Sequence, residues 1–147
     1  QTANGFDRDD TSDAARLARA PLIRHREWLG QNEVRHRLRA IFQTFFADYD
    51  VLLSPVNPVP AIPHDHSPSA SRTIEVNGQE RSYNDLLGWV AMATTCYLPA
   101  TVAPIGSTPQ GLPVGAQIIG PYLEDRTTIE FSKLLGEVIG GFSPPTA

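Results

Sequence analysis

The chain has 147 residues, a formal net charge of −4 and one cysteine, Cys96. A net acidic chain lacks the basic footprint of a nucleic-acid-binding domain. A lone cysteine excludes an internal disulfide and indicates a reducing compartment, and no apolar run is long enough to span a bilayer. The sequence therefore predicts a single soluble, cytoplasmic domain over residues 1–147, with no nucleic-acid or membrane partner.

The first third of the chain is predicted to be helical. Helices are expected over residues 13–20 and 22–46, with Pro21 between them, because proline disfavours a helical conformation in the residue before it and suits the first position of a helix. Five apolar side chains of the second helix follow a helical period: Val34, Leu38, Ile41, Phe42 and Phe45. They predict one stripe that faces a core.

Three arginines lie on this second predicted helix, at Arg35, Arg37 and Arg39. Their positive charge is compatible with an anion site. A solvated helix face explains such a run of charge more simply, so a solvated face is the prediction.

A short buried strand is predicted over residues 51–53, where three apolar residues follow the polar end of the helix. Four prolines come soon after it: Pro55, Pro58, Pro60 and Pro63. Each removes a backbone donor and fixes φ. Residues 54–71 are therefore predicted to form a long proline-rich loop, and loops of that length in compact domains often carry function.

A β-hairpin is predicted next, with strands over residues 72–76 and 79–82. Asn77 and Gly78 suit a two-residue turn in which both central positions have positive φ. A helix over residues 83–95 follows. It is apolar around most of its girth, so it is expected to lie between other elements.

Two β-rich runs near the end of the chain, residues 100–105 and 114–119, are predicted to be neighbouring strands joined by a compact loop. The second run is mostly apolar, which is typical of a central strand covered on both faces. Gly115 and Ala116 carry little side chain, so another element is expected close to this strand. A last helix is predicted over residues 125–139, stopped by two glycines, and the whole order of elements predicts an α/β fold.

The segment LPATVAPIGSTPQGLPVGAQIIGP (residues 98–121) resembles the C-terminal hallmark of the amidase signature family. Three further segments lie around it in the order that this family uses: NEVRHRLR (residues 32–39), DYDVLLSP (residues 48–55) and GPYLEDRTTIEFSKLL (residues 120–135). The resemblance covers roughly residues 20–142. Each motif is weak alone, and their combination and order make the resemblance specific.

The resemblance implies the C-terminal part of the amidase signature mixed sheet, flanked by helices and corresponding to the last third of the family domain. It also implies a parent enzyme that hydrolyses a carboxamide C–N bond through an acyl-serine. That family uses a serine, a second serine in cis peptide linkage and a lysine, all upstream of the region matched here. This chain has no adjacent serine pair and only one lysine, Lys133. No catalytic residue therefore carries over, and the segment is predicted to be inactive alone.

The family's C-terminal part also forms a wall of the substrate pocket, and the end of the apolar helix is where that wall is expected. The resemblance therefore implies five candidate pocket residues: Asp85, Trp89, Met92, Cys96 and Tyr97. Asp85 is the candidate to present a carboxylate to a substrate amine. Core packing is the simpler interpretation of Trp89 and Met92.

Other patterns predict little chemistry. His64-Asp65-His66 offers two imidazoles and a carboxylate, but a metal needs at least one further ligand, so a plain polar loop is predicted and no metal site. Cys96 beside a histidine could imitate a thiol nucleophile, although a buried structural cysteine is the better interpretation. The chain has no phosphate loop, zinc spacing or dinucleotide fingerprint, so no cofactor is predicted.

The leading hypothesis is thus the C-terminal portion of an amidase whose partners are the upstream catalytic portion of the same enzyme and a small amide substrate. One alternative is a non-enzymatic binding module derived from an amidase. Another is a subunit that completes a separately encoded catalytic chain. Cutting the family sheet exposes apolar surface and strand edges, so the isolated chain is also expected to self-associate.

Overall fold

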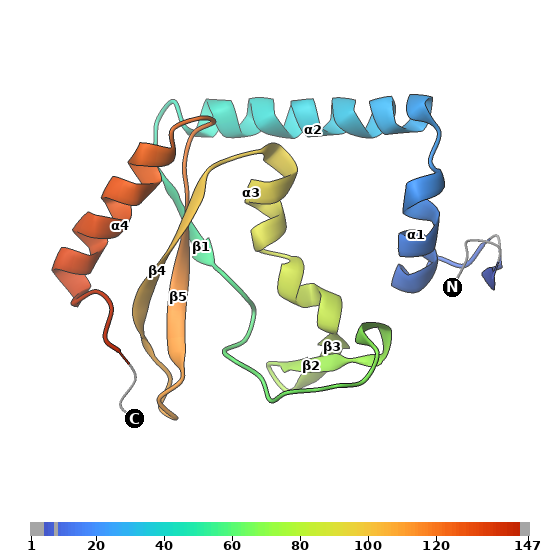
Figure 1. The fold of residues 1–147 in the computed structure, drawn as a ribbon. Coiled ribbons are helices and arrows are strands. Elements are labelled where there is room, and N and C mark those ends of the chain that lie inside the picture. The colour runs from blue at the N-terminus through green and yellow to red at the C-terminus, as the bar shows by residue number, and fades with distance from the viewer. Residues whose placement is uncertain (1–4, 8, 145–147) are drawn as a thin grey trace.

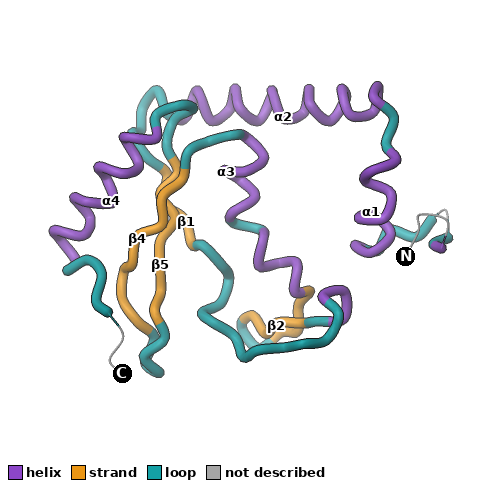
Figure 2. The backbone as a smooth tube through the Cα atoms, in the orientation of Figure 1, coloured by secondary structure: helices purple, strands orange, loops and turns teal. Residues whose placement is uncertain are grey.

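The computed structural model describes residues 5–7 and 9–144, which form a small antiparallel sheet flanked by helices (Figure 1). The helices are α1 (Asp13–Arg19), α2 (His25–Phe45), α3 (Val90–Cys96) and α4 (Asp125–Ile139). The strands are β1 (Leu52–Pro55), β2 (Thr73–Val76), β3 (Gln79–Ser82), β4 (Ala100–Ser107) and β5 (Pro113–Ile119). Short 3₁₀ turns are η2 (Ala20–Leu22), η3 (Ser69–Ser71) and η4 (Tyr83–Leu87). The mixture of helices and strands confirms the predicted α/β class (Figure 2).

β5 is the central strand of the larger sheet, with β1 on one side and β4 on the other, both antiparallel to it. Its last residues, Gln117, Ile118 and Ile119, are all buried. Successive side chains of a strand point to opposite faces, so both faces of β5 are covered at this end. The predictions of a covered central strand and of two neighbouring strands joined by a compact loop are confirmed.

One face of the sheet carries the main apolar cluster. Ile119 packs there with Ala93 and Cys96 of α3. Phe42 and Phe46, at the end of α2, cover the same cluster. The C-terminal end of α2 is therefore anchored to the sheet, while the rest of this helix runs away from it toward α1 (Figure 1).

The other face of the sheet carries α4. Thr101 of β4 is the cross-strand partner of Ile118, and its hydroxyl lies 2.9 Å from the hydroxyl of Thr128 on α4. Gly120 lets the helix approach this closely, because a Cβ at that position would lie only 2.6 Å from Cγ2 of Thr128. The close approach predicted at Gly115 is made by other residues: a Cβ there would lie 2.9 Å from Cγ1 of Val102 on β4 and 3.8 Å from Cγ2 of Val56.

The β2–β3 hairpin confirms the turn prediction. Asn77 and Gly78 have φ values of 52° and 75°, and Val76 pairs with Gln79 across the turn. The loop before the hairpin begins later than predicted, since β1 extends to Pro55. A proline is tolerated there because β1 is an edge strand, where a missing N–H need not break a ladder bond.

The second helix differs from the prediction at its start. η2 holds residues 20–22, Ile23 is extended, and α2 begins only at His25. The Glu27 carboxylate accepts a hydrogen bond from the Arg24 backbone N–H at 2.9 Å, which fixes the beginning of the helix.

The predicted core stripe of α2 is wrong in part. Phe42 packs on the core cluster, but Val34, Leu38 and Ile41 are exposed. In the described part of the chain these three side chains are covered only in part, because the sheet reaches only the end of the helix.

The helix predicted over residues 83–95 is two elements. η4 ends at Leu87, and Gly88 donates its backbone N–H to the Asp85 carbonyl at 3.1 Å. α3 then starts at Val90. Leu87 is exposed, and α3 is covered on one face only: Ala93 and Cys96 are buried, whereas Thr94 and Thr95 are exposed. The prediction that this helix lies between other elements is therefore confirmed only for that face.

Candidate functional site

A hollow of about 430 Å³ lies beside η4 and α3. Three of the five predicted pocket residues line it: Asp85, Trp89 and Met92. Arg81 of the hairpin and Pro58 of the long loop complete its wall. The structure therefore gathers one carboxylate and an apolar surface at this place, with contributions from three separate segments of the chain.

Asp85 already has a partner in this hollow. Its Oδ2 accepts a hydrogen bond from Arg81 Nε at 2.8 Å, and both side chains are partly exposed. A carboxylate accepts several hydrogen bonds, so this ion pair leaves acceptor sites on Asp85 open to a ligand. The pair also fixes the orientation of the carboxylate in the hollow.

A buried polar contact supports the wall from behind, and sequence reasoning missed it. Gln117 is buried in β5 and donates from Nε2 to Ser54 Oγ at 3.0 Å and to the Trp89 carbonyl at 3.3 Å. Buried amides need such partners. The signal was present in the sequence, as a single amide inside an otherwise apolar strand.

Cys96 and Tyr97 do not line this hollow. Cys96 is 1% exposed and lies in the apolar cluster. Burial raises the pKa of its thiol, although the charges of Arg39 and Arg35 oppose that rise. A thiol with a raised pKa stays protonated at neutral pH, which is the opposite of what a nucleophile needs.

Tyr97 ends α3 in the left-handed conformation, with φ 56°. Its hydroxyl accepts a hydrogen bond from Arg35 Nη1 at 2.7 Å, and the Arg35 guanidinium lies 4.7 Å from its ring centre. Tyr97 thus belongs to a group of residues beneath α2. That any of the five residues touches a substrate stays a prediction.

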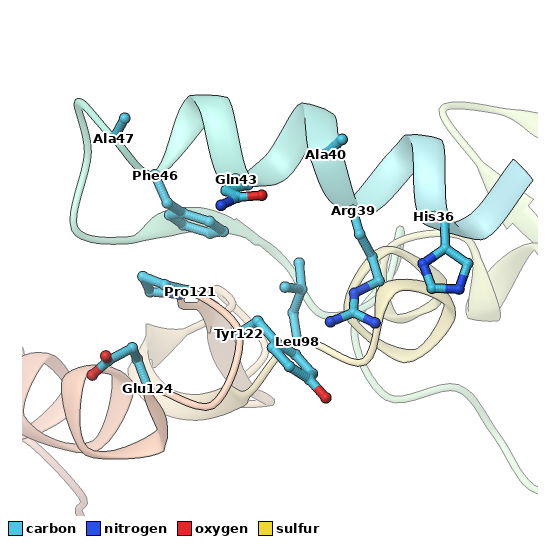
Figure 3. Close-up of a pocket in the computed structure, with 10 residues that line it drawn as sticks. All are labelled: His36, Arg39, Ala40, Gln43, Phe46, Ala47, Leu98, Pro121, Tyr122 and Glu124. Atoms are coloured by element: carbon cyan, nitrogen blue, oxygen red, sulfur yellow. The ribbon is translucent and has the colours of Figure 1, made fainter. Parts of the chain in front are cut away.

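A second hollow, of about 610 Å³, lies beneath α2 (Figure 3). α2 contributes the basic side chains His36 and Arg39, and the loop after β5 contributes Tyr122. The Arg39 guanidinium lies 3.9 Å from the centre of the Tyr122 ring. This distance allows a cation–π contact, which holds the charged group in place.

The polar loop segment His64-Asp65-His66 uses its carboxylate locally. Asp65 Oδ1 accepts a hydrogen bond from the Ser67 backbone N–H at 2.8 Å, and this bond lowers the Asp65 pKa. The two imidazole rings stack with their centres 6.3 Å apart. Across residues 5–7 and 9–144, no three His, Cys, Asp or Glu side chains gather closely enough to hold a metal ion.

Ser54 and Lys133, two side chains of the types that amide hydrolysis uses, have partners within the chain. Ser54 is buried, and its hydroxyl donates to the Pro55 carbonyl at 3.2 Å. Lys133 is exposed on α4, where it pairs with Glu130 at 3.2 Å.

Within the described residues, no helix has the length and apolar character to cross a membrane.

The fold and the hollow beside Asp85 agree with the sequence motifs, and comparison with known proteins identifies the class. A sequence model of the family described as Amidase matches residues 13–129. This match covers most of the chain, so the chain belongs to the amidase family. The predicted membership in the amidase signature family is confirmed.

Individual relatives are similar over most of this chain but over a small part of their own length. One is a subunit of the glutamyl-tRNA(Gln) amidotransferase of Archaeoglobus fulgidus, 33% identical over 113 residues that cover 77% of this chain and 22% of that protein. The fold also matches a crystal structure of an amidase with TM-score 0.72 and 22% identity, covering 93% of this chain and 30% of that one.

A bacterial aryl acylamidase of the amidase signature family also matches, with TM-score 0.62 and 23% identity, over 88% of this chain and 27% of that structure. The chain thus spans less than a third of the length of each of these three proteins. Residues 13–129, which the family model matches, include the strands of the sheet and the residues that line the hollow beside Asp85.

Proposed function

We propose that this chain is the C-terminal portion of an amidase that hydrolyses a carboxamide C–N bond through an acyl-serine. In this proposal the chain supplies the sheet core and one wall of the substrate pocket, and the Ser–Ser–Lys triad lies on residues outside it. The observation that carries the proposal is the hollow lined by Asp85, Trp89 and Met92. It has the lining of a binding site without a nucleophile.

The chemistry of amide hydrolysis supports the absence of activity in the chain alone. The reaction needs an activated nucleophile, a base and donors for the developing oxyanion. Ser54 is buried against Gln117, Cys96 has a raised pKa, and Lys133 is exposed and paired with Glu130. None of the three is placed as an activated nucleophile or as its base.

The wall residues suggest how a substrate is oriented. Asp85, held by Arg81, would accept a hydrogen bond from an amine or amide N–H of the substrate. Trp89 and Met92 would contact its apolar part. Relatives named as part of a glutamyl-tRNA(Gln) amidotransferase and as an aryl acylamidase suggest small carboxamides as the substrate class.

An assay of the purified 147-residue chain tests the proposal directly. A chromogenic acylanilide and a primary carboxamide, followed by dye and ammonia release, should be hydrolysed no faster than in buffer. Hydrolysis that rises with protein concentration contradicts the proposal. The variants Ser54→Ala and Cys96→Ala then show whether either residue is the nucleophile.

The genomic reading frame around Gln1 separates the enzyme from its alternatives. A Gly/Ser-rich signature with two serines and an earlier lysine, in frame and upstream, supports the amidase. A start codon directly before Gln1 supports a binding module or a subunit. Co-purification of a catalytic chain from the native host would identify the subunit.

Exposed apolar side chains on α2 support the self-association of the isolated chain. Ile41 is 65% exposed, and Val34 and Leu38 lie on the same stripe. We expect a concentration-dependent increase in mass by light scattering, which Ile41→Lys should reduce. A monomeric wild-type chain at high concentration contradicts this part of the proposal.

A cytoplasmic location is also part of the proposal. Cys96 is a free, buried thiol and the chain's one cysteine, which fits a reducing compartment. Fractionation of the native host with an antibody to the chain tests this location, and recovery from the membrane or secreted fraction contradicts it.

A further inference from the structure

Two arginine side chains of α2 are partly buried: Arg39 lines the hollow beneath the helix, and Arg35 is not among its lining residues. Arg39 lies over the Tyr122 ring, and among the described residues no carboxylate lies within ion-pair distance of Arg39 or Arg35. Arg35 donates to Asn32 and Tyr97, but its Nε is buried and has no acceptor. Arg35 does not line the hollow, so the positive charge that a ligand there can pair with is that of Arg39.

These arginines do not form the solvated helix face that the sequence predicted. Arg35 and Arg39 are partly buried and contact tyrosine rings. Arg37, on the same helix, is exposed and makes no contact with the hollow. Arg39 thus lies at the hollow and Arg37 faces solvent on the same helix. A substitution of Arg37 removes the same charge without changing the hollow, so it serves as the control for a substitution of Arg39.

The lining restricts the shape and charge of a ligand. Apolar side chains line much of the rest of the hollow: Leu98 lies near Arg39, and Phe46 and Pro121 lie toward the far end (Figure 3). Figure 3 shows Glu124 at the opposite end of the hollow from Arg39. A second negative charge at that end would be repelled, while an apolar body would be accommodated.

The conformation of Tyr97 is further support. It has φ 56°, a left-handed conformation that glycine adopts without strain and that a bulky residue rarely occupies. Its ring contacts Arg35 and its hydroxyl accepts from the same guanidinium. The Tyr97 ring also lies 6.0 Å from the Arg39 guanidinium, which is thus held near two tyrosine rings, those of Tyr97 and Tyr122.

We propose that the hollow beneath α2 binds a monocarboxylate with an apolar body, such as an aryl or short alkyl acid. The carboxylate pairs with the planar donors of Arg39, with His36 beside it, and the apolar body lies against Phe46, Leu98 and Pro121. Guanidinium groups match carboxylates in a bidentate geometry, and a hollow of about 610 Å³ has room for a small acid. The proposal does not depend on amide hydrolysis, since this hollow shares no lining residue with the one beside Asp85.

Isothermal titration of the 147-residue chain with benzoate tests the proposal, with benzamide as the neutral analogue and inorganic phosphate as the competing anion. We expect saturable binding of benzoate at one site. Benzamide and phosphate should bind at least about tenfold more weakly, because a charge-assisted hydrogen bond to the guanidinium is lost or the apolar body is missing.

Matched variants locate the site. Arg39→Gln should weaken benzoate binding at least about tenfold, whereas Arg37→Gln, which removes the same charge two residues away, should leave it within about twofold. Ala40→Phe fills the hollow from an exposed helix position and should abolish binding while circular dichroism stays unchanged. It keeps the test decisive if Arg39→Gln does not fold.

Four results overturn the proposal. They are no benzoate binding at millimolar concentration, equal binding of benzamide, tighter binding of phosphate, and Arg39→Gln or Ala40→Phe binding benzoate as the wild type does. None of them bears on the amidase assay, so the two proposals fail separately.

Discussion

β5 and α2 both have apolar sequence patterns, but the structure uses the two patterns differently. β5 lies between two helices, and Ile118 and Ile119 are completely buried. α2 has no buried residue in its 21 positions, and Ile41 is 65% exposed. An apolar pattern therefore shows which face of an element can be buried. Whether that face is buried depends on whether another element packs against it.

The contrast has a direct consequence for mutations. The free-energy cost of removing a side chain depends on the contacts that it loses, not on its chemical type. The same substitution should thus have a large effect in β5 and a small or opposite effect in α2.

The largest expected effect is the loss of a β5 core side chain. Ile119→Ala should lower the free energy of unfolding by about 2–5 kcal/mol, because it leaves a cavity among Ala93, Cys96 and Leu98. Ile41→Ala should change it by no more than about 0.5 kcal/mol. Urea denaturation of both variants measures the difference, and equal losses would refute the contrast.

Two glycines give the second prediction, with opposite signs. Gly120→Ala should destabilise the chain by about 1–3 kcal/mol, because the new methyl group would lie 2.6 Å from Cγ2 of the buried Thr128. Gly30→Ala in α2 should stabilise it by about 0.5–1 kcal/mol, because alanine favours the helix and nothing lies within 4 Å of its Cβ. Thermal unfolding of both variants should show melting temperatures that move in opposite directions. Movement in the same direction contradicts the packing described for α4.

A third and smaller effect concerns the polar contact that joins α4 to the sheet. The Thr101 and Thr128 hydroxyls are 2.9 Å apart, and Thr128 also donates to the Asp125 carbonyl. A double-mutant cycle with Thr101→Val and Thr128→Val should give a coupling free energy of about 0.5–1.5 kcal/mol. A coupling of zero would mean that the two hydroxyls do not interact in solution.

The fold could be predicted where local chemistry decides the structure. The Asn77-Gly78 turn depends on two residues that tolerate positive φ, and the structure has this turn. The C-terminal stop of α4 depends likewise on Gly140, with φ 98°. The break of the predicted 83–95 helix was missed, because Gly88 and Trp89 keep helical backbone angles and only the hydrogen-bond pattern differs, with Gly88 N–H donating three residues back to Asp85.

The candidate site could be predicted only in part. The segment from Asp85 to Met92 lies along one wall, so its residues stay together in space. Cys96 and Tyr97 follow closely in sequence. Cys96 is the last residue of α3 and is buried in the core, whereas Tyr97 caps the helix and is exposed. The contact of Tyr97 with Arg35 spans 62 positions, and no local pattern encodes a contact of that range.

The last prediction concerns pH, and its effect should be the smallest. Burial raises the pKa of the Cys96 thiol in the folded chain, whereas an unfolded thiol ionises near pH 8.5, roughly the value in model peptides. Below that pH both states keep the proton, so the contribution to stability is fully present. Between the unfolded and the folded pKa only the unfolded state loses the proton, and stability therefore falls as pH rises.

Cys96→Ala isolates this contribution from the other groups that titrate in the same range. The variant should be less stable at every pH, because it leaves a small cavity beside Ile119. Its melting temperature should nevertheless fall less steeply than that of the wild type above about pH 8.5, since no buried thiol remains to be ionised. Tyrosine and lysine ionisation is common to both proteins and cancels in the difference between the slopes. Equal slopes would mean that the thiol is as well solvated in the folded chain as in the unfolded one, and β5 would then be less well covered than the packing around Ile119 requires.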